Sequence, residues 1–130
     1  MGGVIFNPDQ NSKKKIAWGI GYQSKNLTKV LALYQGINIL IEDNINEAII
    51  LEDSALVMHS HLFNTPPSNL RMECLFMRTR EEMRLMEKIH FFYVLEENNN
   101  DADAMANQGS TLRARVLRIN DEFARLEPIP

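Results

Sequence analysis

The chain lacks several features that by themselves identify a class of protein. Its 130 residues include one cysteine, Cys74, which excludes an internal disulfide and a four-cysteine metal site. No apolar run is long enough to span a membrane, and the first residues do not resemble a secretory signal. The formal net charge is −3, so the molecule as a whole does not attract nucleic acid. We therefore expect a soluble, intracellular protein of the cytoplasm or the nucleus.

The composition is that of a globular domain, and its reactive side chains are expected to have structural roles. The chain is long enough to bury a core, with 45% hydrophobic residues to fill it. Cys74 lies between Leu70 and Met77 in a segment with helical spacing, so we expect a small core residue. His59 and His61 are two residues apart and cannot share a helix face. We expect them to be surface or capping residues and not a metal pair.

Hydrophobic spacing predicts a mixture of strands and helices. We expect strands at 4–6 and 16–22, a helix at 27–42, a strand at 48–51, helices at 55–62 and 69–88, a strand at 89–95 and a helix at 101–108. Asn26 and Ser68 are the predicted N-caps of the two long helices, and Gly109 ends the last helix. The first two strands predict an antiparallel hairpin with the lysines at 13–15 in its turn.

The strand at 48–51 is the most informative segment, because acidic residues follow it. Asp53 and Ser54 lie at its carboxyl end, where open α/β sheets place their ligands. Asp53 is therefore either a metal ligand or the N-cap of the next helix. Glu52 adds a carboxylate, although strand alternation is expected to turn it away from Asp53. A second carboxylate, Asp103, lies one turn inside the helix at 101–108.

Three segments together resemble the RNase H family. Asn26, with Leu31-Ala32-Leu33 and Gly36, is similar to the segment that opens the family's first long helix. Residues 49–57 are similar to its strand that ends in Asp-Ser. Residues 97–107 are similar to its final motif, in which Ala-Asp-x-x-Ala follows an asparagine-containing loop. The segments occur in the family's order over about residues 2–110, and the reverse-transcriptase-associated domains of plant retroelements are the most similar type.

The resemblance implies an α/β fold of the RNase H type, a mixed β-sheet flanked by helices, over residues 1–110. An extended C-terminal arm with some strand character is expected at 111–130. The family's first strand, which is central in its sheet, would precede Gly2-Gly3, so we expect an N-terminally truncated domain that lacks it. Two sheet edges are then unpaired. We expect direct pairing of the hairpin with the strand at 48–51, or a homodimer, in preference to a strand from another protein.

The family cleaves the RNA strand of RNA–DNA hybrids with two divalent ions held by four acidic residues. Asp53 and Asp103 match two of these positions, while Lys29 aligns with the family's glutamate in the first long helix. A lysine ammonium about 4 Å from a second cation is opposed by about 4 kcal/mol at an effective dielectric constant of 20. The resemblance therefore implies a degenerate catalytic site that holds at most one weakly bound Mg²⁺, at Asp53 and Asp103, and more simply none. We expect Lys29 to form an ion pair with one of these carboxylates.

The sequence thus favours a domain that binds and does not cleave. The expected ligand is nucleic acid, such as an RNA–DNA hybrid contacted by Asn26, Lys29 and Asn99, or a protein at the unpaired sheet edges. No membrane partner is expected. The alternative is an active, metal-dependent hybrid ribonuclease whose missing carboxylates come from a partner chain.

Overall fold

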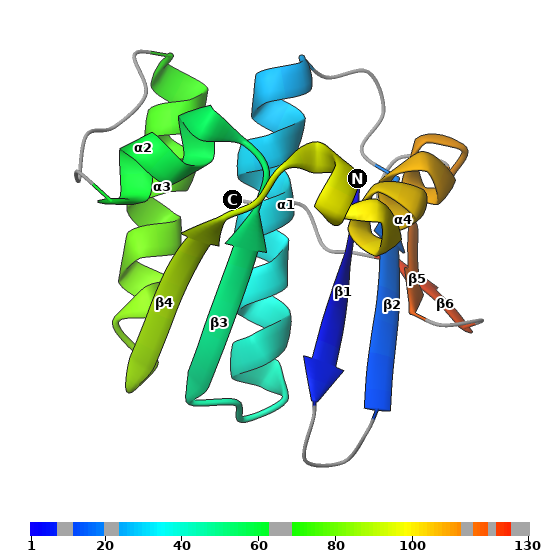
Figure 1. Ribbon diagram of the computed structural model, residues 1–130, viewed down its shortest axis with the longest axis horizontal. Coiled ribbons are helices and arrows are strands. Elements are labelled where there is room, and N and C mark those ends of the chain that lie inside the picture. The colour runs from blue at the N-terminus through cyan, green and yellow to red at the C-terminus, as the bar shows by residue number, and fades with distance from the viewer. Residues whose placement is uncertain (8–11, 20–23, 63–68, 113–115, 120–121, 126–130) are drawn as a thin grey trace. The chain divides into compact units, whose positions relative to one another are not determined.

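The computed structural model describes residues 1–7, 12–19, 24–62, 69–112, 116–119 and 122–125 (Figure 1). The chain divides into two compact units. One is the segment Lys25–Asn99, and the other combines Met1–Ser24 with Asn100–Pro130. Among the helices of the described residues, none has both the length and the apolar character that a membrane crossing requires.

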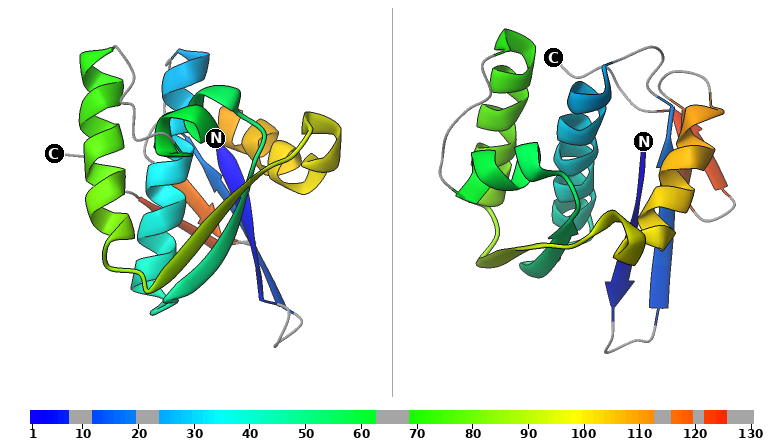
Figure 2. Two further views of the ribbon diagram at one scale, coloured as in Figure 1. Left: turned by 60° about the vertical axis from the view of Figure 1, so that its left-hand side comes forward. Right: turned by 45° about the horizontal axis from the view of Figure 1, so that its top comes forward.

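Parallel strands and helices make up the unit of residues 25–99. Its elements are α1 (Lys25–Glu42), β3 (Glu47–Glu52), α2 (Ala55–Leu62), α3 (Leu70–Met83), β4 (Lys88–Tyr93) and the 3-10 helix η1 (Glu96–Asn98). The strands β3 and β4 pair in parallel, with Glu47 opposite Lys88 and Glu52 opposite Tyr93. Helices α1 and α3 lie side by side (Figure 2). The predicted helices and strands of this unit are therefore confirmed, apart from their ends.

Helix α1 supplies much of the core, because its apolar residues recur at helical spacing. The predicted N-cap Asn26 is wrong, since the helix begins at Lys25 and Asn26 is an exposed residue of its first turn. After Glu42 the chain turns through Asn44, whose φ of 57° is in the left-handed region that asparagine tolerates. The buried apolar residues of α1 are Leu27, Val30, Leu31, Leu33, Ile37, Ile39 and Leu40.

The ends of α3 also differ from the prediction. Its N-cap is Asn69, whose Oδ1 accepts hydrogen bonds from the N–H groups of Arg71 (3.0 Å) and Met72 (3.2 Å). The predicted cap, Ser68, lies outside the described residues. The helix ends at Met83 and not at residue 88, because residue 88 already belongs to the ladder between β3 and β4.

Cys74 is exposed, so the prediction of a core cysteine is wrong. It lies on the outer face of α3 with the exposed residues Leu70 and Met77, at the i, i+4 and i+7 positions of one helix face. Leu75 and Phe76 point to the other side and are buried. Both faces of α3 carry apolar residues, and for that reason the sequence pattern alone does not identify the buried one.

His61 is buried, so the prediction of a surface or capping residue is wrong for it, whereas His59 is exposed. The His61 ring lies 4.8 Å from the Phe76 ring and stacks on the Phe91 ring at 5.6 Å. Its Nδ1 atom is buried and has no hydrogen-bond partner among the described residues. Burial lowers the pKa of His61 to about 4, and the nearby Arg80 guanidinium adds to this effect. His61 is therefore neutral at pH 7.

The second unit is built on an antiparallel sheet. Its elements are β1 (Gly2–Asn7), β2 (Ser12–Trp18), α4 (Asn100–Ser110), β5 (Val116–Ile119) and β6 (Glu122–Arg125). The described strands pair in the order β1-β2-β5-β6, and α4 packs against β1 and β2. The predicted hairpin is confirmed, but the lysines at 13–15 are not in its turn. They belong to β2 opposite Phe6, Ile5 and Val4. Longer strands are favoured because they pair more of the hairpin's backbone N–H and C=O groups.

Each unit contains a strand with a free edge. Among the described strands, β3 is hydrogen-bonded to β4 and to no other strand, and β1 is hydrogen-bonded only to β2. Direct pairing of the hairpin with β3, one of the two preferred closures, would join the two units and stays a prediction. Closure by a second chain stays a prediction, as does the division between a domain at 1–110 and an arm at 111–130. The expected strand character of that arm is present in β5 and β6.

Two glycines, one in each unit, test the packing inside that unit. A Cβ atom at Gly2 would overlap the backbone of Met105 and Ala106 in α4, so we expect Gly2→Ala to lower the free energy of unfolding by about 1–3 kcal/mol. A Cβ atom at Gly36 meets no atom within 4 Å, so Gly36→Ala should raise it by about 0.5–1 kcal/mol through helix propensity. Urea denaturation measures both values, and effects of the same sign would contradict this packing.

Candidate functional site at the carboxyl ends of β3 and β4

The parallel pairing of β3 with β4 brings the carboxyl ends of both strands to one edge of the unit. The ladder continues one step past β4, where the Val94 N–H donates to the Glu52 carbonyl at 3.0 Å. The chain then enters η1, so Asn99 follows closely after β4 while Asp53 follows β3. Residues 52–54 and residue 99, far apart in the sequence, are therefore neighbours at this edge.

Asp53 and Asn99 are in direct contact. The Asn99 Nδ2 donates a hydrogen bond to the Asp53 Oδ2 at 3.3 Å, and both side chains are half-buried. The N-cap of α2 is Ser54, because the Ser54 Oγ accepts a hydrogen bond from the Val57 N–H at 3.3 Å. The sequence left open whether Asp53 is a metal ligand or the N-cap of the next helix. Ser54, and not Asp53, has the capping role.

Glu52 is the member of this site whose importance the sequence analysis missed. Its Oε1 accepts a hydrogen bond from the Ser54 N–H at 3.0 Å. Burial raises the pKa of Glu52 to about 7, and the charge of Asp53 also raises it, while backbone N–H groups of Ser54 and Asp53 and the charge of Lys29 lower it. Strand alternation therefore does not separate Glu52 electrostatically from Asp53. The sequence did contain a signal for this. Side chains alternate along a strand, so Glu52 shares a face of β3 with Ala48 and Ile50, which are also half-buried.

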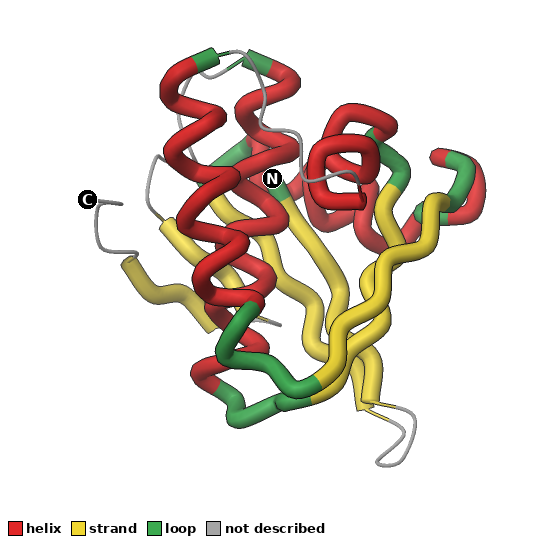
Figure 3. Tube along the Cα trace, turned by 90° about the vertical axis from the view of Figure 1, so that its left-hand side faces the viewer, coloured by secondary structure: helices red, strands yellow, loops and turns green. Residues whose placement is uncertain are grey.

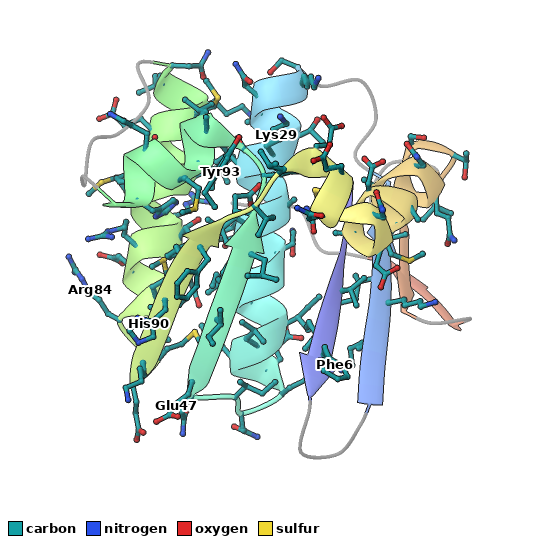
Figure 4. All side chains as sticks on the ribbon, in the orientation of Figure 1. Phe6, Lys29, Glu47, Arg84, His90 and Tyr93 are labelled. Carbon is teal, nitrogen blue, oxygen red and sulfur yellow. The ribbon has the colours of Figure 1, made fainter. Side chains whose placement is uncertain are left out.

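The positive charge that acts on Glu52 is that of Lys29. It lies in the second turn of α1, and Figure 4 shows it at the end of α1 beside the carboxyl ends of β3 and β4. The expected ion pair of Lys29 with Asp53 or Asp103 stays a prediction, since the electrostatic partner that the structure identifies is Glu52. Helix α1 has no acidic residue in its first turn, where Lys25 and Asn26 are exposed.

The predicted site residues are divided between the two units. Asn26, Lys29, Asp53 and Asn99 belong to the unit of residues 25–99, whereas Asp103 is an exposed residue of α4 in the other unit. Among the described residues, no group of three or more histidine, cysteine, aspartate or glutamate side chains is arranged to hold a metal ion. The arrangement at β3 and β4 is instead a mixed one, with two adjacent carboxylates, one amide and one ammonium group.

Comparisons with known proteins identify the fold. No protein-family model and no curated protein sequence matches the chain. The structure is similar to RNase H1 from the halophilic archaeon Halobacterium salinarum, with a TM-score of 0.74, 20% identity and coverage of 83% of this chain and 82% of that one. It is also similar to the N-terminal RNase H domain of rv2228c from Mycobacterium tuberculosis, with a TM-score of 0.77, 21% identity and coverage of 84% of both chains. The chain therefore has an RNase H-like α/β fold.

Glu52 and His61 make opposite contributions to the pH dependence of stability. The pKa of Glu52 is raised from 4.5 to about 7, so the folded state binds the proton more tightly and stability rises as the pH falls from 7 to 4.5. The pKa of His61 is lowered from 6.5 to about 4, so the unfolded state binds the proton more tightly and stability falls as the pH falls from 6.5 to 4. Each contribution is on the order of 2–3 kcal/mol, and they largely cancel between pH 6.5 and 4.5.

Single substitutions should separate the two contributions. We expect Glu52→Gln to lose on the order of 2 kcal/mol of stability as the pH falls from 6.5 to 4.5, because only His61 then titrates. We expect His61→Leu to gain a similar amount over the same range, because only Glu52 then titrates. Urea denaturation at a series of pH values measures both. Parallel pH profiles for the two variants and the parent chain would show that these groups are not buried as described.

Proposed function

We propose that this chain is a nucleic-acid-binding domain that contacts an RNA–DNA hybrid and has lost, or nearly lost, hydrolysis. The fold it shares with RNase H proteins supports the choice of ligand. The expected contacts are Asn26, Lys29 and Asn99, and the expected remnant of a catalytic site is Asp53 with Asp103. We infer that no metal pair is bound there, and at most a weak Mg²⁺ ion.

The charge of the site supports loss of catalysis. Two divalent ions repel each other and need several carboxylates to hold them. At this edge Lys29 acts on the same carboxylate, Glu52, that would have to contribute charge, and a pKa of about 7 leaves Glu52 about half protonated at neutral pH. Asp53 is already engaged by the Asn99 amide. The residues present therefore do not suit a pair of divalent ions.

The first turns of α1 suit a phosphate backbone. The N-terminus of a helix carries a partial positive charge, which favours anions. Helix α1 adds Lys25 and Asn26 in its first turn and Lys29 one turn later, with no acidic residue in the first turn. This combination of two lysines with a helix N-terminus is the single observation that most favours nucleic-acid binding, and it is local, so it does not conflict with the net charge of −3.

A protein ligand is the second candidate. The free edge of β3 presents backbone N–H and C=O groups that a strand from another chain can pair with. A homodimer or another protein at this edge would explain why β3 lacks a second partner among the described strands.

A binding titration with matched variants tests the nucleic-acid function. We expect the chain to bind an RNA–DNA hybrid in a filter assay, and Lys29→Glu to weaken binding about tenfold and to reduce the salt slope by about one, because a phosphate contact is lost. Arg84→Glu is the control, because it makes the same change of charge. Arg84 is an exposed cation between α3 and the start of β4, away from the carboxyl end of β4 (Figure 4), so this variant should bind like the parent chain.

A cleavage assay with Mg²⁺ or Mn²⁺ completes this test. We expect no turnover of the hybrid by the parent chain. Robust turnover that Asp53→Asn abolishes would contradict the proposal and favour an active ribonuclease completed by carboxylates from a partner chain. Absence of hybrid binding at low salt would instead favour the protein-binding candidate.

A further inference from the structure

One face of the β3–β4 pair is exposed and apolar. Along β3, exposed and half-buried residues alternate, and the exposed ones include Ile49 (66% exposed) and Leu51 (56%). On β4, Phe92 (55%) is exposed directly opposite Leu51. Large apolar side chains this close together on an exposed surface commonly mark a contact with another molecule.

The direction of the strands strengthens this argument. Parallel sheets occur almost only where both of their faces are covered. Helices α1 and α3 lie on one side of β3 and β4, as Figure 3 shows. The other side carries the exposed residues Ile49, Leu51 and Phe92. Within the described part of residues 25–99, this parallel pair therefore has one covered face and one open face.

The register of the two strands makes the open face complementary to itself. Directly opposed residues form three rows across the face: Glu47 with Lys88, Ile49 with His90, and Leu51 with Phe92. All six side chains are exposed. Each row thus has one member on β3 and one on β4, the first row pairs opposite charges, and the last row is fully apolar.

We propose that this face is the interface of a homodimer in which two copies stack face to face with their strands parallel. A two-fold axis that runs along the strands places β3 of one copy over β4 of the other, so that every row meets its own equivalent. Glu47 then faces Lys88 of the second copy and Leu51 faces Phe92 of the second copy, at the spacing of about 10 Å that separates packed sheets.

The antiparallel arrangement of the same two faces is much less favourable. It would place Leu51 and Phe92 over Glu47 and Lys88 of the second copy, which removes charged groups from water against an apolar surface. The opposite charges of Glu47 and Lys88 therefore favour a second copy of this chain as the occupant, with its strands running in the same direction. This interface uses the open face of the sheet and not the first turns of α1, so it does not depend on the proposed nucleic-acid function.

Sedimentation equilibrium over a range of concentrations tests the dimer. We expect the parent chain to dimerise with a dissociation constant on the order of micromolar. Phe92→Asp should raise this constant at least about a hundredfold, because it places a charge in the apolar row. Leu70→Asp is the matched control, because Leu70 is 75% exposed on α3 and should leave the constant unchanged.

A mixing experiment tests the direction of the strands. Glu47→Lys and Lys88→Glu should each weaken self-association at least about tenfold, because like charges then meet in the first row. A mixture of the two variants should form dimers with the parent's affinity. One chain then carries lysine at positions 47 and 88 and the other carries glutamate at both, so opposite charges meet again. Circular dichroism confirms that each variant is folded. A monomeric parent chain, a dimer that Phe92→Asp does not affect, or a mixture that fails to recover would each overturn the proposal.

Discussion

The hydrogen-bond ladder between β3 and β4 is the constraint on which both the candidate site and the exposed face depend. Because the strands are parallel and in register from Glu47 with Lys88 to Glu52 with Tyr93, their carboxyl ends meet at one edge. Because side chains alternate along a strand, Ala48, Ile50 and Glu52 turn to the covered side. Glu52 is thus half-buried by the same alternation that exposes Ile49 and Leu51.

At that edge, contributions that raise and contributions that lower the pKa of Glu52 partly offset one another. Two adjacent carboxylates would repel each other if both were ionised, and burial makes the ionised form of Glu52 costly. The backbone N–H groups of Ser54 and Asp53 and the charge of Lys29 offset part of that cost. A site in which a lysine acts on a partly protonated Glu52 can be stable without a metal ion, and this is why the charge of Lys29 is central to the proposed loss of hydrolysis.

Local patterns in the sequence predicted much of this fold. Helical spacing identified α1, and the turn through Asn44 and Asn46 separated it from β3. The Asp-Ser pair correctly marked the end of β3 and the start of α2. These features succeed because each depends on residues that are close together in the chain.

Features set by tertiary contacts could not be predicted in the same way. The lysines at 13–15 are polar and resemble a turn, yet pairing with residues 4–6 draws them into β2. His61 is a polar residue whose burial depends on Phe76 and Phe91, which come from two other elements. The contact between Asn99 and Asp53 likewise follows from the parallel register and not from either local motif.

Titration calorimetry of Mn²⁺ into the parent chain and into Lys29→Glu tests the central claim most directly. If Lys29 keeps divalent ions from this edge, the parent chain should show no saturable binding beyond a weak event. Lys29→Glu should then bind Mn²⁺ at least about tenfold more tightly, because a repulsive charge becomes a ligand. Tight binding of two Mn²⁺ ions by the parent chain, unchanged by the substitution, would contradict the account.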